Sequence, residues 1–178
     1  MDVYEAISQR RSIRRYKPDP VGQEQLTRVL EAARLAPSWK NQQCWRYVVI
    51  TEETGKIGVA AACADTNPGK NALKTAPVVV VLCANPQASG IMGDRLYYMV
   101  DCGITMEHLV LAAKAEGLAT CWIGAFDEET AKTAVGAPAD WRVVAMTPLG
   151  YPDHSPSPTP RRDVSDVFRK EKWDGKGV

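Results

Sequence analysis

The sequence has little of the chemistry that metalloproteins need. It contains only two histidines, His108 and His154, and neither stands beside a second type of metal ligand. Its five cysteines are widely spaced, and no two of them form a CxxC pair. Zinc sites and disulfide frameworks normally use short paired spacings. We therefore expect no metal site, and we interpret the cysteines as buried, reduced thiols that pack as small apolar residues.

Long apolar runs and a strong net charge are also missing. The best apolar run, Ala76 to Ala84, is far shorter than the roughly 18 residues that a membrane-spanning helix needs. Asp2, Glu5 and nearby arginines interrupt any secretion signal at the N-terminus. A formal net charge of +1 gives no overall field toward nucleic acid or an anionic membrane. We expect a cytoplasmic protein that binds neither.

The common catalytic and phosphate-binding motifs do not occur either. No GxGxxG opens a helix, and GxxxxGK[ST] and GxSxG are absent. With two histidines and no clear carboxylate pair, the chain lacks the usual acid and base groups. This pattern favours chemistry carried by a bound cofactor, with the protein supplying position and electrostatics.

Helical and extended patterns alternate along the chain. Helices are expected at 3–10, 23–35, 52–64, 97–115 and 128–135, and strands at 46–51, 77–83, 119–123 and 141–149. The strand at 77–83 is apolar at successive positions, so both of its faces should be covered. The helix at 97–115 is apolar all around, which suits a buried helix at a subunit interface. One core of this size predicts a single domain, 1–178, with a three-layer α/β or α+β architecture. Residues 152–178 are expected to form an extended C-terminal arm, because their first part is rich in proline.

An arginine cluster follows the first predicted helix. Arg10, Arg11, Arg14 and Arg15 surround Ser12. Guanidinium groups match phosphate geometry, and the hydroxyl can add another hydrogen bond. If the helix continued, Arg10 and Arg14 would lie on one side of it. A solvated basic patch, or an arm that touches nucleic acid, is the alternative interpretation.

Three further segments could contact a ligand. The first, APSWKNQQCW (residues 36–45), places consecutive side-chain amides beside two tryptophans, and such amides can pair with the edge of a flat heterocycle such as flavin. The second, CWIGAF (121–126), is a turn of small residues that lets backbone N–H groups approach a ligand. The third is the basic pair Arg161 and Arg162, at the far end of the proline-rich stretch. Each segment also has a purely structural explanation: a helix cap, an ordinary turn and a charged tail.

Taken in order, six segments resemble the nitroreductase family of FMN enzymes. They are RRSIRRY (10–16), APSWKNQQCW (36–45), APVVVVLCA (76–84), GLATCWIGAF (117–126), PLGYP (148–152) and RRDVSDVFRKEKW (161–173). The resemblance implies an α+β, three-layer α/β/α fold with a mainly antiparallel central sheet. It also implies an intertwined homodimer with FMN between the subunits and an extended C-terminal arm. The implied reaction passes electrons from NAD(P)H or another reductant through FMN to a small electron-poor acceptor, such as a nitro or quinone-like compound.

The resemblance also assigns site residues to each subunit. Arg10 and Ser12 would face the phosphate and ribityl chain, Arg11 would contribute mainly backbone, and Arg14 would reach the pyrimidine edge and support the reduced flavin. The turn residues Ile123, Gly124 and Ala125 and the basic pair Arg161 and Arg162 would bind the FMN of the same subunit. Pro37, Ser38, Asn41 and Gln43 would contact the FMN of the partner subunit. Asn67 or Lys70 matches a further ribityl contact. No side chain is assigned a catalytic proton transfer.

The chain departs from the family pattern at two positions. Gly124 stands where relatives that reduce nitroaromatics often carry a glutamate, and Cys44 replaces a common proline. The chain is also short for the family, so we expect a more open pocket formed partly by residues 85–95. Flavin-fragmenting and dehalogenating enzymes of the same fold are therefore alternatives, as is a non-catalytic flavin-binding protein.

Overall fold

The central strand of the fold is β2 (Val78–Ala84), whose seven side chains are all buried. The computed structural model describes residues 1–175. In it, β2 pairs with β1 (Trp45–Ile50) on one side and with β6 (Arg142–Gly150) on the other, and β6 also pairs with β5 (Ala119–Thr120). All of these pairings are antiparallel. The long β-branched run of β2 fits this place, since both faces of the strand are covered.

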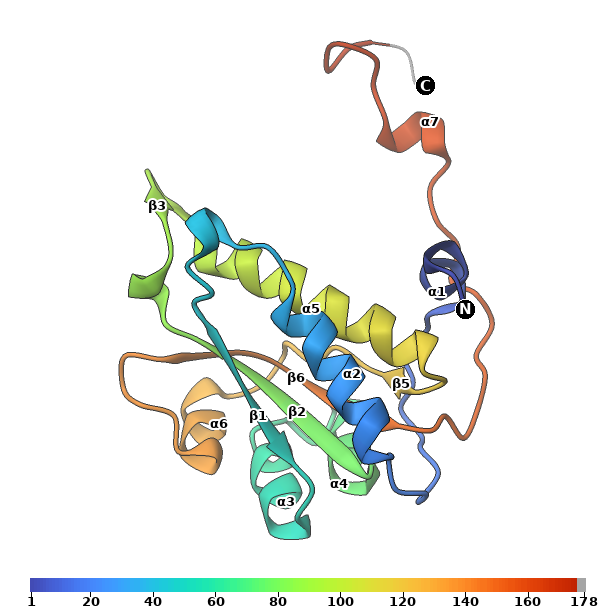
Figure 1. Ribbon diagram of the computed structural model, residues 1–178, viewed down its shortest axis with the longest axis vertical. Helices are drawn as coiled ribbons and strands as arrows, with labels where there is room; N and C mark the ends of the chain where they lie inside the picture. Colours follow the sequence, from blue (N-terminus) through green and yellow to red (C-terminus); the bar gives the residue numbers. More distant parts are fainter. Residues whose placement is uncertain (176–178) are drawn as a thin grey trace.

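Helices cover both faces of the sheet. The face that carries Val78, Val80 and Leu82 packs against α2 (Gln23–Arg34) and α5 (Tyr97–Ala115). The opposite face, with Val79 and Val81, packs against α3 (Glu53–Ala61), α4 (Lys70–Thr75) and α6 (Glu128–Val135). Figure 1 shows α2 beside α5 on one side of the sheet and α3, α4 and α6 on the other side. The predicted three-layer α/β/α fold with an antiparallel sheet is confirmed.

The main differences from the sequence prediction lie in short elements. The structure adds η1 (Trp39–Asn41), η2 (Pro86–Ala88), the hairpin strands β3 (Ile91–Met92) and β4 (Arg95–Leu96), and α7 (Val164–Val167). α4 was not predicted. β5 ends after Thr120, and Ile123 joins the sheet only through a single bridge to Met146. Elements this short carry too few residues for a periodic pattern to show.

The first helix, α1 (Val3–Gln9), begins with a capping box. The Asp2 side chain accepts from the Glu5 N–H, and the Glu5 side chain accepts from the Asp2 N–H. The helix ends at Gln9, because Arg10 already has extended dihedral angles (φ −60°, ψ 134°). The helix thus ends one residue before its predicted end at Arg10, and no helical turn places Arg10 and Arg14 on one side.

The chain beyond Pro152 leaves the sheet. Residues 157–174 are exposed, and Figure 1 shows α7 standing away from the layered body. The last three residues of the arm predicted at 152–178 lie outside the described residues. No helix within residues 1–175 is both long and apolar enough to cross a membrane.

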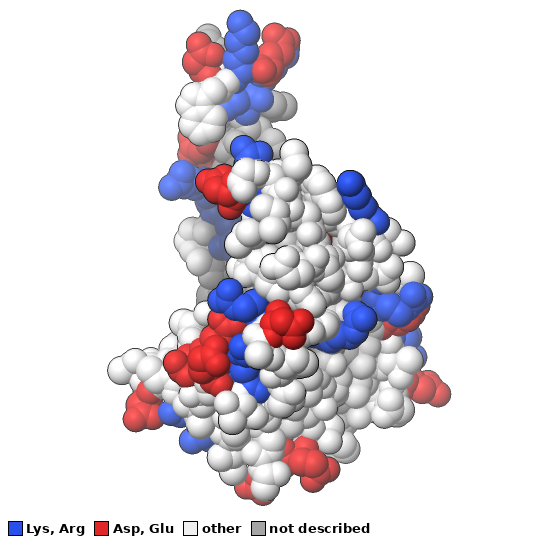
Figure 2. All heavy atoms as spheres, turned by 90° about the vertical axis from the view of Figure 1, so that its left-hand side faces the viewer, with Lys and Arg blue, Asp and Glu red and all other residues white. Residues whose placement is uncertain are grey.

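One face of the molecule exposes apolar side chains. The β3–β4 hairpin and the start of α5 leave Ile91, Met92, Leu96, Met99 and Val100 about half exposed. Figure 2, seen from the β3 side of Figure 1, shows a broad area without charged groups below the projecting C-terminal segment. Apolar patches on this scale usually mark interfaces.

Candidate functional site

The arginine segment runs as extended chain beside β5. Ser12 forms a parallel bridge with Thr120, and the Ile13 N–H donates to the Thr120 carbonyl at 2.9 Å. Further on, the Lys17 N–H donates to the Tyr151 carbonyl at 2.9 Å. These bonds tie the segment to the edge of the sheet, so alternate side chains point to opposite sides of the chain.

This arrangement places four basic side chains around one hollow of about 590 Å³. Arg10, Arg11 and Arg14 line it together with Arg161 from the C-terminal segment, and Ser12 lies between the arginines. The structure thus brings together two predicted basic clusters that are far apart in sequence. Arg162, the other member of the C-terminal pair, is exposed and does not line this hollow.

Arg11 uses part of its guanidinium group within the chain. Its Nη1 donates to the Ser8 carbonyl at 2.8 Å and to the Arg10 carbonyl at 2.7 Å. Within residues 1–175, the ion pair of Arg10 is a long one, with 4.0 Å between its Nε and Glu107 Oε1 of α5. Most of the donors of Arg10 therefore remain available to an anion in the hollow.

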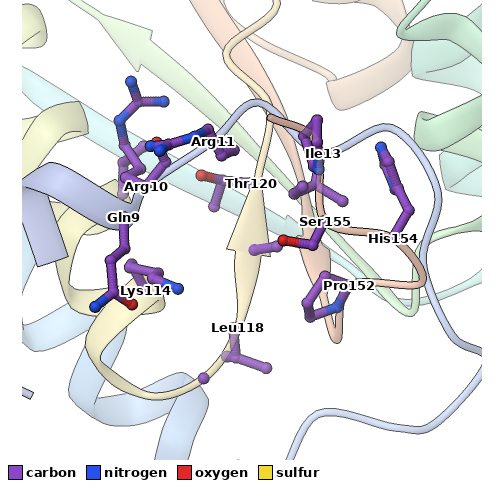
Figure 3. A pocket seen from close by; sticks show the side chains of 14 residues that line it. Gln9, Arg10, Arg11, Ile13, Lys114, Leu118, Thr120, Pro152, His154 and Ser155 are labelled. Atoms are coloured by element: carbon purple, nitrogen blue, oxygen red, sulfur yellow. The ribbon is translucent and has the colours of Figure 1, made fainter. Parts of the chain in front are cut away.

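A smaller pocket of about 100 Å³ adjoins this hollow and shares Arg10 and Arg11 with it. Figure 3 shows these two arginines across the pocket from His154 and Ser155. The Nδ1 atom of His154 is buried and has no hydrogen-bond partner in the part of the chain that the structure describes. Lys114 of α5 adds another cation to the wall. Lys114 and His154 were not predicted as site residues, because a single lysine and a single histidine carry no motif.

A third hollow, of about 130 Å³, lies against the turn after β5. It is lined by Arg14, by Asn67 to Gly69 and by Cys121 to Ala125, so Arg14 borders both this hollow and the larger one. Gly124 and Ala125 are exposed, and their backbone is accessible to a ligand. A Cβ at Gly124 would come no closer than 3.7 Å to Trp122 Nε1, so crowding within this chain does not require a glycine here.

Ile123 occupies a different environment from the two residues after it. Its N–H donates to the Met146 carbonyl at 2.8 Å, and its carbonyl accepts from the Met146 N–H at 3.0 Å. Its side chain is buried in the core below the sheet. Both polar backbone groups are thus used in the fold, and the turn leaves the sheet only at Gly124.

Asn67 and Lys70, the suggested ribityl contacts, both have partners within the chain. The Asn67 amide donates to the Ala125 carbonyl at 2.8 Å, and its Oδ1 accepts from the Gly69 N–H at 2.8 Å. Lys70 Nζ pairs with Asp65 at 2.8 Å. Asn67 therefore supports the turn at 124–125 from below.

Two acidic groups near the arginine segment remain protonated. Burial raises the pKa of the Tyr16 phenol, which donates to the Ile13 carbonyl at 2.6 Å. Burial also raises the pKa of the Cys121 thiol, although Arg14 acts in the opposite direction. Neither group ionises near neutral pH, so neither neutralises the arginines.

The segment with consecutive side-chain amides (residues 36–45), here called the amide segment, lies elsewhere in the same chain. Pro37, Ser38, Asn41 and Gln43 line none of the three hollows. The segment is fastened near the start of α5, where Asp101 accepts from the Trp39 N–H at 2.8 Å. The small pocket instead contains Lys114, about 20 Å further along the helix at 1.5 Å per residue. The described chain thus presents two separate groups of predicted site residues.

Comparisons with known proteins agree with the fold. The model of the Nitroreductase family matches residues 7–72 and 59–151. The crystal structure of a nitroreductase family protein from Clostridium novyi NT is 35% identical, covers 99% of this chain and 97% of its own, and superposes with a TM-score of 0.84.

Two further proteins have more specific names. The NADPH:FMN oxidoreductase from Vibrio harveyi, solved with NAD⁺, is 25% identical over 97% of this chain and 78% of its own, with a TM-score of 0.84. The 5,6-dimethylbenzimidazole synthase of Rhodospirillum rubrum is 32% identical over 85% of this chain and 82% of its own. From the family match, the identity across almost the whole chain and the shared fold, we conclude that this chain belongs to the nitroreductase family.

Proposed function

We propose that the protein is an FMN-dependent oxidoreductase that works as a homodimer. The observation that carries this proposal is the hollow in which Arg10, Arg11 and Arg14 meet Arg161 around Ser12. Its volume of about 590 Å³ lies within the roughly 300–1,000 Å³ usual for cofactor sites. The structurally similar Vibrio harveyi enzyme, by its name, acts on NADPH and FMN.

The donor set fits FMN at both ends of the site. The phosphate of FMN is an anion with several acceptor oxygens, and Arg10, Ser12 and Arg161 supply charge and hydrogen bonds to match it. The exposed backbone of Gly124 and Ala125 supplies N–H groups for the polar edge of the ring, beside Arg14. Arg162 follows Arg161 directly and would add positive charge next to the phosphate site, although its side chain does not line the hollow.

A second copy of the chain would complete the site. Ser38, Asn41 and Gln43 carry polar groups that fit a ring edge, yet in their own chain they lie apart from the arginine hollow. The exposed apolar residues of α1 support dimerisation, since Tyr4 is 80% exposed and Val3 and Ile7 are more than half exposed. We infer that the amide segment of one subunit faces the arginine hollow of the other.

When bound, FMN would supply two-electron exchange between a nicotinamide donor and a small electron-poor acceptor. The protein's contribution is position and electrostatics. Arg14 places a permanent positive charge beside the turn, where it favours negative charge on the reduced ring. Among residues 1–175, those that line the hollow next to the turn are Arg14, Asn67 to Gly69 and Cys121 to Ala125, and we assign none of them a proton transfer.

A reaction on the flavin itself is the second candidate. It is favoured by Gly124, which removes the carboxylate often found in nitroaromatic reductases, and by the similarity to a relative named as a 5,6-dimethylbenzimidazole synthase. In that case reduced FMN would be consumed rather than recycled.

The visible spectrum of the purified protein tests the proposal. We expect yellow protein with one FMN per chain, identified after heat release, and prompt bleaching when NADH or NADPH is added without oxygen. Recovery of intact FMN after many turnovers supports the oxidoreductase, and its loss supports the second candidate. Yellow protein that no nicotinamide bleaches indicates a flavin carrier, and protein that takes up no FMN contradicts both enzyme functions.

A further inference from the structure

The amide segment has an unfavourable backbone conformation. Lys40 (φ 46°), Asn41 (φ 55°) and Gln43 (φ 50°) all lie in the left-handed region, although none is glycine. The left-handed form is unfavourable for residues other than glycine, although asparagine adopts it more readily than lysine or glutamine. A segment with three such residues keeps this conformation only when its surroundings hold it. The contacts that hold the segment in this conformation therefore determine the orientation of its side-chain amides.

Bonds inside the segment close it only locally. Ser38 Oγ accepts from the Gln43 N–H at 2.9 Å, and Gln43 Nε2 donates to the Asn41 side chain at 3.1 Å. These bonds move with the segment and do not attach it to the rest of the fold. Its position must be set by contacts to other elements.

Asp101 of α5 provides the polar attachment. Its Oδ1 accepts from the Trp39 N–H at 2.8 Å, and its Oδ2 accepts from Ser89 Oγ at 2.7 Å. The Cys44 thiol, at the end of the same segment, lies 3.6 Å from Oδ2. One carboxylate thus joins both ends of the segment to the long helix and to the loop at Ser89.

The burial of Asp101 shows how specific this arrangement is. The residue is only 2% exposed, and no ion pair involves it within residues 1–175. An unpaired buried carboxylate is costly unless hydrogen-bond donors surround it. A leucine or methionine would suit this apolar helix better if packing alone were required. The hydrogen bonds that Asp101 accepts, rather than packing, therefore explain why an aspartate occupies this position.

Apolar contacts fix the other side of the segment. The Trp39 ring packs on Tyr97, with centroids 4.3 Å apart. It also lies directly over Gly90, where an added Cβ would come 2.4 Å from the ring. The Trp39 side chain and its backbone N–H are thus held by the same end of α5.

We propose that Asp101 is the positioning residue for the cofactor site: it holds residues 38–43 in the strained form that meets the flavin of the partner subunit. This inference rests on the proposed function and adds to it a residue outside the predicted site. The same helix carries Glu107, which pairs with Arg10 of the arginine hollow, and Lys114, which lines the adjoining small pocket. α5 thus sets the distance between the arginine hollow and residues 38–43 of one chain. In the proposed dimer these two groups would contact different flavins.

Substitutions at Asp101 separate hydrogen bonding from charge. Asp101→Asn keeps an oxygen for the Trp39 N–H and turns an amide N–H toward Ser89 Oγ, whereas Asp101→Ala removes every acceptor. We expect Asp101→Ala to weaken FMN binding at least tenfold and Asp101→Asn to weaken it less than threefold. Asp101→Ser serves if the alanine variant does not fold, since its short hydroxyl can bond within the helix but falls short of Trp39.

The matched control is Thr105→Ala, one turn further along α5. Thr105 is fully buried, donates to the Ala33 carbonyl at 2.7 Å and lies 3.0 Å from the Tyr47 hydroxyl, so its hydrogen bonds go to α2 and β1 rather than to residues 38–43. Its loss should lower the melting temperature and leave FMN affinity within twofold. A general loss of stability would instead weaken FMN binding in both variants.

Hydrogen exchange gives a second readout that needs no flavin. In the FMN-free dimer, Asp101→Ala should speed exchange of the Trp39 and Gln43 amides at least tenfold, and Asp101→Asn should leave them protected. A folded Asp101→Ala protein with unchanged FMN affinity overturns the proposal, and so does an Asp101→Asn protein as impaired as Asp101→Ala. Failure of the wild-type protein to bind FMN would instead refute the proposed function, while the exchange rates would still show whether Asp101 holds the segment.

Discussion

The side-chain amide of Asn67 donates to the carbonyl of Ala125 at 2.8 Å, so the loop before α4 holds the turn after β5. The other end of the same amide accepts from the Gly69 N–H at 2.8 Å. Gly69 in turn lies under Ile123, whose Cδ1 would be 2.7 Å from an added Cβ. The turn at 124–125 is thus positioned by residues almost 60 positions earlier in the chain.

Asn67→Ala should therefore loosen the turn. A neutral hydrogen bond is worth about 1 kcal/mol, so we expect FMN to bind about fivefold more weakly, measured by fluorescence titration. Asn71→Ala is the matched control, because Asn71 lies on the nearby helix α4 with an exposed side chain. Equal FMN affinities in the two variants would show that the turn does not contact the cofactor.

Arg14→Ala should slow flavin reduction more than it weakens FMN binding. Arg14 lines the hollow beside Gly124 as well as the larger one, so under the proposed function its charge would act on the flavin ring rather than mainly on the phosphate. We expect a lower reduction potential, measured by dye equilibration, and a slower anaerobic bleaching rate. Arg14→Lys keeps the charge and should retain most of the rate. Losses of equal size in binding and reduction would assign Arg14 to cofactor binding alone.

The pair Glu128–Arg142 predicts a pH-dependent contribution to stability. Arg142 donates twice to the Glu128 carboxylate at 2.6 Å, and the Val143 N–H adds a third bond at 3.1 Å. These contacts lower the pKa of Glu128 below its ordinary value of 4.5. A lowered folded-state pKa stabilises the fold above the unfolded-state pKa, and this contribution is lost as the pH falls through the folded-state pKa.

Glu128→Gln should thus cost about 1 kcal/mol of unfolding free energy at pH 7, since Arg142 is half exposed and solvent screens the pair. The difference from wild type should shrink below pH 4.5. Chemical denaturation at several pH values measures it. Glu129→Gln, whose carboxylate is 82% exposed, should have little effect. A Glu128→Gln cost that is the same at pH 7 and at low pH would exclude this electrostatic origin.

Long elements were predictable because their patterns repeat. The helix at 97–115 and the helix at 128–135 have the predicted bounds, since apolar spacing and the stop at Gly136 mark them. Gly136 has a φ of 63°, the left-handed form that ends a helix. β2 was predicted within one residue from its unbroken β-branched run.

The site was predictable only in part, because tertiary contacts create much of it. The meeting of Arg10 with Arg161 depends on how the C-terminal segment returns past β5, and no local pattern records that path. α1 ends at Gln9, one residue before its predicted end, but the bridge of Ser12 to Thr120 that follows could not be predicted from the local sequence. Asp101 gave one signal: a single acid in the apolar stretch from Tyr97 to Met106.

A mixed dimer tests most directly the central claim, that each flavin lies between two subunits. One chain carries Arg10→Ala and the other Asn41→Ala, with different tags so that only mixed dimers are purified. If the arginine hollow of one subunit faces residues 38–43 of the other, one site combines both substitutions and the second site contains neither. We predict one tightly bound FMN per mixed dimer, whereas both parent homodimers bind FMN weakly. A mixed dimer without any tight site would contradict the account, because every site would then be built from a single chain.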